Sequence, residues 1–251
     1  MRAPLCLLGL LLPTVACSDD AATPLDGPPP VDARPPDAAP DAPAGPDLSC
    51  LGDAPPTTAP AMITVRSTLT DLATGQPVAD VGYELRRRID DTIAGAATSA
   101  ADGRVAVTVA TGGAPLDVYV RYGKAGYATF YDYFADPLIA DLTLVDGVTT
   151  PAGYAGYYPV DLPADPAAGT LALVVRDCAG APLPGVAIAL TPPAARMIGL
   201  TAGVTGPTGE VYGLNVPAGA VTIAMTLDGT ALQSQAVTAF ASGVTYLEVH
   251  P

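Results

Sequence analysis

The chain contains no tryptophan, a single histidine and a single lysine. A catalytic zinc site takes three His, Cys or carboxylate ligands, and the one histidine, His250, stands beside the last residue, so the sequence offers no such site. It also lacks a Gly-x-Ser-x-Gly motif, a phosphate-binding loop and a spare cysteine with a histidine partner, which nucleophilic catalysis would need. These absences favour a protein that is not an enzyme and that requires no metal or cofactor.

Basic residues are also scarce. The 25 acidic residues outnumber the 11 basic ones and give a formal net charge of −14. Nucleic-acid binding requires basic patches that neutralise phosphates. The only cationic cluster, residues 86–88, is followed at once by Asp90 and Asp91. We therefore expect no nucleic-acid partner.

The N-terminal segment reads MRAPLCLLGLLLPTVAC, with one cation at Arg2, an apolar run and small residues before Cys17. This layout is typical of a secretory signal peptide, residues 1–16, and the run is too short to span a bilayer. The stretch from Thr14 to Cys17 resembles a bacterial lipobox, which implies acylation of Cys17; an unlipidated cut at the same place is the alternative. The resemblance implies a protein held in the cell envelope by lipid, and Ser18 favours the outer membrane.

The next segment, residues 17–60, consists largely of Asp, Pro, Ala, Gly and Thr and has no aromatic residue. Such a composition cannot bury enough apolar surface to fold. Its prolines favour extended polyproline II, and its carboxylates repel one another. We expect a disordered stalk that holds folded domains away from the lipid surface.

The cysteines predict one disulfide. Of the four cysteines, Cys6 leaves with the signal peptide and Cys17 takes the lipid, which leaves Cys50 and Cys178. Disulfides persist in an oxidising compartment. A bond between Cys50 and Cys178 would attach the end of the stalk to the second domain; two free buried thiols are the alternative.

Beyond the stalk, short runs rich in Val, Ile, Thr, Tyr and Leu alternate with turn residues, and no window keeps a 3.6-residue period. This texture predicts an all-β fold. The pattern occurs twice, because residues 70–85 match residues 175–190 and each copy is followed by a turn closed by glycine. We expect two tandem immunoglobulin-like or prealbumin-like β-sandwiches, residues 61–146 and 169–251, joined by an ordered connector over residues 147–168.

The repeated motif G-x-P-(V/L)-x-(G/D)-V-x-(Y/I)-x-L, together with KAGYATF in the first copy, resembles the carboxypeptidase regulatory-like domain. That family is a transthyretin-like β-sandwich related to collagen-adhesin B-type repeats. The motif specifies turns and core faces, so the resemblance implies a fold and no catalytic activity. The order of lipobox, stalk, LSCLG and sandwich also resembles lipoproteins of myxobacteria-like species.

Aromatic residues are unevenly distributed, with ten of the 14 between Tyr119 and Tyr158. On a strand, Phe130 and Phe134 would share one face, with Asp132 between them, and tyrosines would share the other. One face must be core; the other could bind sugar rings or a partner protein. The alternative is that the tyrosines cover the joint between the domains. The candidate ligand-binding residues are Tyr127, Tyr131, Tyr133, Tyr157 and Tyr158.

Together these features predict a non-catalytic, membrane-anchored envelope lipoprotein whose two sandwiches serve adhesion, scaffolding or protein contact. A carbohydrate-binding module that uses the tyrosine face is the alternative function. The expected partners are the membrane, through the lipid, and an envelope protein or polysaccharide.

Overall fold

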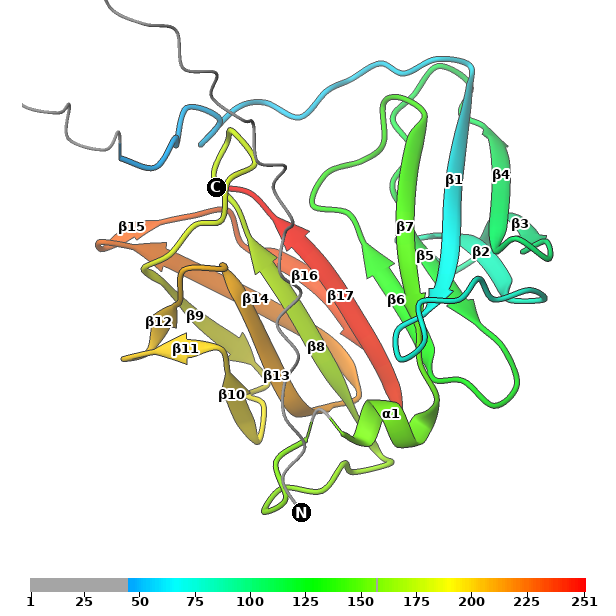
Figure 1. Ribbon diagram of the computed structural model, residues 1–251. Coiled ribbons are helices and arrows are strands. Elements are labelled where there is room, and N and C mark those ends of the chain that lie inside the picture. The colour runs from blue at the N-terminus through cyan, green and yellow to red at the C-terminus, as the bar shows by residue number, and fades with distance from the viewer. Residues whose placement is uncertain (1–44, 157) are drawn as a thin grey trace, which may run out of the picture. The chain divides into compact units, whose positions relative to one another are not determined.

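The computed structural model describes residues 45–156 and 158–251. Cys17, the expected signal peptide and most of the expected stalk lie outside these residues. Within them, the regular structure is almost entirely β, with one short helix, α1 (Pro151–Ala155), which confirms the predicted all-β fold (Figure 1). No helix of the described residues is long and apolar enough to cross a membrane.

The first half of the described chain contains seven strands. They are β1 (Met62–Asp71), β2 (Gly82–Arg87), β3 (Ile93–Thr98), β4 (Arg104–Ala110), β5 (Val118–Gly123), β6 (Thr129–Tyr133) and β7 (Leu142–Val148). Three of them form a sheet in the order β4-β1-β7, in which β1 pairs antiparallel with β4 and parallel with β7. β7 is therefore an edge strand.

The second half contains ten strands. They are β8 (Ala168–Val175), β9 (Val186–Thr191), β10 (Arg196–Ile198), β11 (Leu200–Thr201), β12 (Val204–Thr205), β13 (Glu210–Pro217), β14 (Gly219–Leu227), β15 (Thr230–Ala231), β16 (Gln235–Ala239) and β17 (Gly243–Val249). A six-stranded sheet takes the order β11-β12-β9-β14-β15, with β16 also paired to β14.

A third sheet runs through both halves. Its eight strands take the order β10-β13-β8-β17-β6-β5-β2-β3. The halves meet where β17 pairs parallel with β6, from Gly243 opposite Thr129 to Leu247 opposite Tyr133. The two sandwiches are thus tandem in sequence but share one sheet in space, an arrangement that the sequence pattern did not predict.

The two hydrophobic cores lie on opposite faces of this shared sheet. Phe130 on β6 belongs to the first core, with Tyr83 and Val120, whereas its neighbour Tyr131 belongs to the second core, with Leu171. Successive side chains of a strand point to opposite faces. The three-stranded sheet therefore covers one face at the β3 end of the shared sheet, and the six-stranded sheet covers the other face at the β10 end.

The predicted disulfide is confirmed. Cys50 and Cys178 are bonded with an S–S distance of 2.04 Å. Nearby, the Cys178 N–H donates to the Asp47 carbonyl at 2.8 Å, and the Asp47 N–H donates to the Asp177 carboxylate at 3.2 Å. The segment that leaves the expected stalk is thereby fixed to the second half.

The chain between β7 and β8 packs against the shared sheet. Thr150 caps α1 by accepting a hydrogen bond from the Gly153 N–H. Tyr154 is buried and its hydroxyl bonds to Thr170 on β8, which also bonds the Tyr158 hydroxyl at 2.6 Å. Tertiary contacts thus hold this short helix, which is too short to be stable alone.

Candidate functional site

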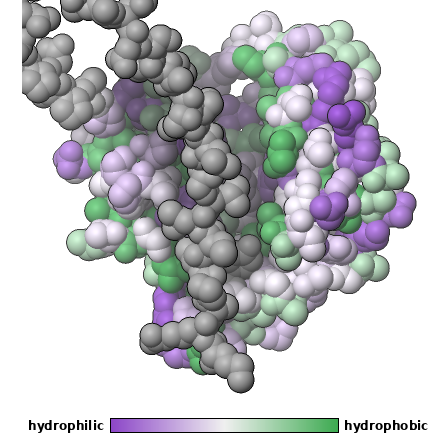
Figure 2. Space-filling model, viewed as in Figure 1, coloured by the Kyte–Doolittle hydropathy of each residue, from purple (hydrophilic) through white to green (hydrophobic). Residues whose placement is uncertain are grey.

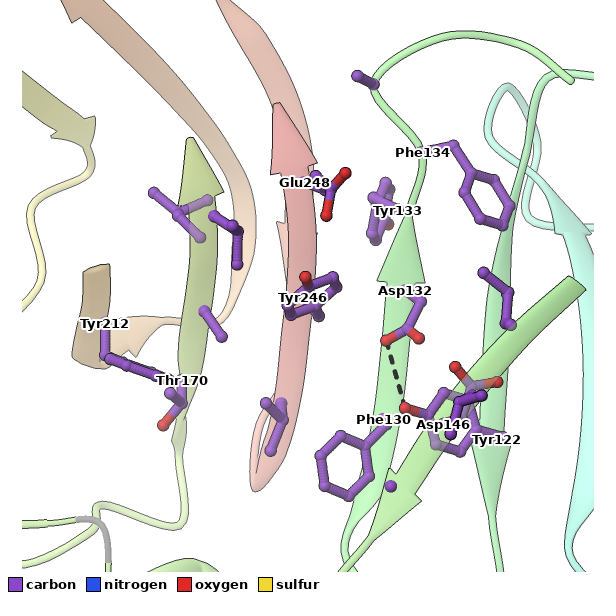
Figure 3. A pocket seen from close by; sticks show the side chains of 18 of the residues that line it. Tyr122, Phe130, Asp132, Tyr133, Phe134, Asp146, Thr170, Tyr212, Tyr246 and Glu248 are labelled. Atoms are coloured by element: carbon purple, nitrogen blue, oxygen red, sulfur yellow. Dashed lines mark hydrogen bonds between the residues drawn. The ribbon is translucent and has the colours of Figure 1, made fainter. Parts of the chain in front are cut away.

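A groove of about 750 Å³ lies on the face of the shared sheet that the three-stranded sheet leaves uncovered. Its volume falls within the range of ordinary ligand sites. Alternate residues of β8, β13 and β17 form its floor, and all of them point to one side because of the two-residue period of a strand. The floor includes Thr170, Ala172, Tyr212, Leu214, Val244 and Tyr246 (Figure 3).

The strand β7 forms one wall. Leu144, Val145, Asp146 and Gly147 line the groove in succession. Because successive side chains point to opposite faces, a groove that contacts four in a row runs along the edge of the strand. Figure 2 shows hydrophobic residues exposed on the side of the first half that borders the groove, whereas polar residues gather on its outer side.

Two buried carboxyls, Asp132 on β6 and Asp146 on β7, stand at the inner end of the groove. The Ser67 hydroxyl donates to Asp146 at 2.6 Å, and the Tyr83 hydroxyl donates to the same oxygen at 3.2 Å. The Tyr122 hydroxyl donates to Asp132 at 3.4 Å (Figure 3). The packing of the three-stranded sheet against the shared sheet thus brings together two acids from different sheets.

Burial raises the pKa of Asp132 well above its ordinary value, and the nearby charge of Asp146 raises it further. Burial also raises the pKa of Asp146, although hydrogen bonds from Ser67 and Tyr83 partly offset this. These raised pKa values favour the protonated form of the pair in the acidic range. Neither has a Lys, Arg or His within 4.0 Å among the described residues.

The remaining charged residues of the lining are also mainly acidic. Glu248 lines the groove on β17 and forms an ion pair with Arg176 at 2.8 Å, with His250 beside it at 3.9 Å. Asp136 is exposed and makes no ion pair with another described residue. No lysine or arginine occurs among the described residues that line the groove. The groove therefore combines an apolar floor with an excess of carboxyls.

Two of the predicted binding tyrosines, Tyr131 and Tyr133, are buried, although Tyr133 also lines the groove. Tyr131 stacks on Phe240 with ring centroids 3.7 Å apart, and Tyr133 stacks on Tyr119 at 4.7 Å. Both are buried in the second core. The expectation of one exposed face fails because β6 lies inside the shared sheet, where both faces are covered. These tyrosines occupy the joint between the halves, which was the alternative position.

The other predicted tyrosines are not gathered into one site. Tyr127 is half-buried at the edge of the first core, and Tyr158 bonds to Thr170 beside the groove. Tyr157 lies outside the described residues. The aromatic residues of the groove include Tyr212 and Tyr246, which no sequence motif marked.

One signal of the observed site is present in the sequence. Asp132 lies between Phe130 and Phe134 on an apolar strand face, and a charged residue in that position indicates a buried polar site. Asp146 had no comparable signal. Within the described chain, no group of three or more His, Cys, Asp and Glu residues could hold a metal ion.

No protein-family model and no curated protein matches the sequence. The resemblance to the carboxypeptidase regulatory-like domain therefore remains a prediction, while the β-sandwich fold is observed directly. Several solved structures align with parts of the chain.

The Bacillus anthracis TIE protein aligns at 13% identity over 76% of this chain and 34% of its own, with a TM-score of 0.27. A streptococcal ancillary pilin aligns at 13% identity over 76% of this chain and 62% of its own, with a TM-score of 0.26. This chain thus spans only part of either protein. The 3-chlorocatechol 1,2-dioxygenase of Rhodococcus opacus 1CP aligns at 15% identity over 43% of this chain and 68% of its own, with a TM-score of 0.27. Similarity at this level assigns no function.

Proposed function

We propose that the protein is a non-catalytic lipoprotein of the cell envelope whose joined sandwiches serve protein contact. The observation that carries this proposal is the groove between the edge strand β7 and the uncovered face of the shared sheet. Binding sites occur preferentially where two domains meet. Here the shared sheet forms the floor of the groove and the three-stranded sheet packed against it supplies the β7 wall, so a partner would meet a preformed surface.

The anchoring part of the proposal rests on the sequence. Cys17 resembles the acylated residue of a lipobox, and a polar, proline-rich segment follows it. The Cys50–Cys178 disulfide then attaches the end of that segment to the second half. A lipid anchor, a spacer and a rigid head are the parts that an envelope contact protein needs.

Photo-crosslinking in intact cells that produce the protein tests the proposed contact. A photoreactive amino acid would replace Val145, which lines the groove and is 80% exposed. The matched control position is Ile89, which is 90% exposed and lies outside the groove. We expect a discrete protein adduct from position 145 and none from position 89. Absence of any adduct from position 145 would refute the contact function.

The anchor has a separate test. The Cys17→Ala variant should leave the membrane fraction and lose labelling by a clickable fatty acid. It should also lose the crosslink at position 145 if the partner is confined to the envelope. Unchanged membrane retention of Cys17→Ala would reject lipid anchoring while leaving the groove intact.

A further inference from the structure

The free edge of β7 has unused backbone groups. The Leu72 N–H donates to the Val148 carbonyl at 2.9 Å. In a parallel pair, alternate residues of a strand bond to the neighbouring strand, so the even-numbered residues of β7 bond to β1. Thr143, Val145 and Gly147 therefore direct their N–H and C=O groups away from β1. β7 pairs with no second strand of the described chain.

A hydrogen bond just beyond β7 confirms that its odd-numbered residues face away from β1. The Ala128 N–H donates to the Thr149 carbonyl at 2.8 Å, on the side of the strand away from β1. This bond closes the edge at the C-terminal end of β7, next to α1. The backbone groups of the three preceding odd-numbered residues bond to no other described residue and lie open along the groove. An open strand edge is a ready template for another extended chain.

The groove also has a suitable floor for such a chain. One row of side chains from a strand added to β7 would point towards Tyr246 and Tyr212 on the shared sheet, and the other row would point outward. Rigid aromatic rings provide contact area with little loss of side-chain entropy. Apolar residues in the inward row would therefore be favoured.

The charge of the groove restricts the partner further. Asp132 and Asp146 lie at the inner end and form no ion pair with a described cation, and Asp136 stands exposed at the rim. A carboxyl that is buried without a cation is costly to ionise, and a cation brought to it from a partner would replace the missing counter-charge. A like charge at the same place would be rejected.

We propose that the groove binds an extended segment of a partner polypeptide, which pairs with the free edge of β7 and places one lysine or arginine against Asp132 and Asp146. This inference rests on the proposed contact function and specifies its partner. The neighbouring side chains of the bound segment on the inward row are apolar. Asp132 and Asp146 determine the register of the bound segment against β7, because only one position of the segment lies beside them.

The test uses an end-capped peptide of seven residues, the length of β7, that alternates threonine and valine around a central lysine. A second peptide carries glutamate at the centre, and a third carries the lysine but has methylated amides that cannot pair with a strand. Each is titrated into the ¹⁵N-labelled full-length protein in detergent solution. Backbone amide shifts of Thr143, Val145 and Gly147 report pairing with β7.

We expect the lysine peptide to shift these three amides and to bind at least about tenfold more tightly than the glutamate peptide. The Asp132→Asn/Asp146→Asn variant should lose that preference. The Asp102→Asn variant should keep it, because Asp102 is an exposed residue outside the groove. The Val145→Pro variant removes an N–H group that points away from β1 and does not bond to it. The fold should therefore persist, and peptide binding should be lost.

Three results would overturn the inference. The first is the absence of shifts with the lysine peptide, and the second is equal binding of the lysine and glutamate peptides. The third is undiminished binding of the methylated peptide or of hexylammonium alone, which would indicate a site for small amines without strand pairing. Each of these is compatible with a crosslink at position 145, so failure here is distinguishable from failure of the contact function.

Discussion

Replacing Tyr131 by alanine should destabilise both halves of the protein together. Tyr131 is 9% exposed and its ring stacks on Phe240 in the second core, while its strand β6 also carries Phe130 into the first core. Truncating a buried aromatic residue to alanine costs about 3–5 kcal/mol. Domains of this kind are stable by about 5–15 kcal/mol in total. Tyr131→Ala should therefore lose a large part of the free energy of unfolding.

Urea unfolding, followed by circular dichroism and by hydrogen exchange of Val65 and Val211, measures this effect. The two residues belong to the first and second cores. Because one sheet connects the cores, both should unfold in a single transition in the wild type and in the variant. The matched control, Tyr131→Phe, keeps the ring and loses only the hydroxyl, so it should cost no more than about 1 kcal/mol. A loss below about 1 kcal/mol for Tyr131→Ala would refute close packing at the joint, and separate transitions would refute the coupling of the halves.

Three further outcomes follow from the structure. Replacing Cys50 and Cys178 by serine opens a link across 128 positions and should reduce the free energy of unfolding in urea by up to about 5 kcal/mol; an unchanged midpoint would contradict this. Because the pKa values of Asp132 and Asp146 are raised in the folded protein, the pair stabilises the fold fully only below the ordinary carboxyl pKa. This stabilisation is lost as pH rises through the raised pKa values. Thermal melts should show this loss in the wild type relative to Asp132→Asn/Asp146→Asn, and a difference that does not vary with pH would exclude it. Brief proteolysis under oxidising conditions should trim the expected stalk before Ser49 and spare Gly153, which lies in a helix held by buried contacts; early cleavage at Gly153 would show a loose connection.

The sequence predicted local features of the fold well and the joint between the halves poorly. Strand alternation and glycine-containing turns are local signals, and both sandwiches follow them. The parallel pairing of β17 with β6 joins residues more than a hundred positions apart, and no local pattern specifies it. A clue was present in β6, where Phe130 and Tyr131 are both aromatic. Large apolar residues on both faces are typical of a strand in the middle of a sheet.

The candidate site was partly visible for the same reason. Asp132 stood out because it interrupts an apolar face, but its partner Asp146 lies on a different sheet. The groove itself arises because the two smaller sheets cover opposite faces at opposite ends of the shared sheet. That offset depends on which strands pair across the joint, so the groove became apparent only with the complete topology.

The acid pair connects the stability of the protein to the binding proposed for it, with opposite dependence on pH. The tyrosines that face the pair, Tyr83, Tyr122 and Tyr246, have raised pKa values because they are buried, so they stay neutral in the acidic range. As pH rises, the carboxyls ionise and the pair contributes less to stability. The same ionisation creates the charge that a lysine of the partner would meet, so the lysine peptide should bind more tightly as pH rises. Two buried carboxyls without a counter-charge do not help to stabilise the fold once they ionise. If a cationic partner binds beside them, its charge offsets this loss, and binding restores the stability that ionisation removed.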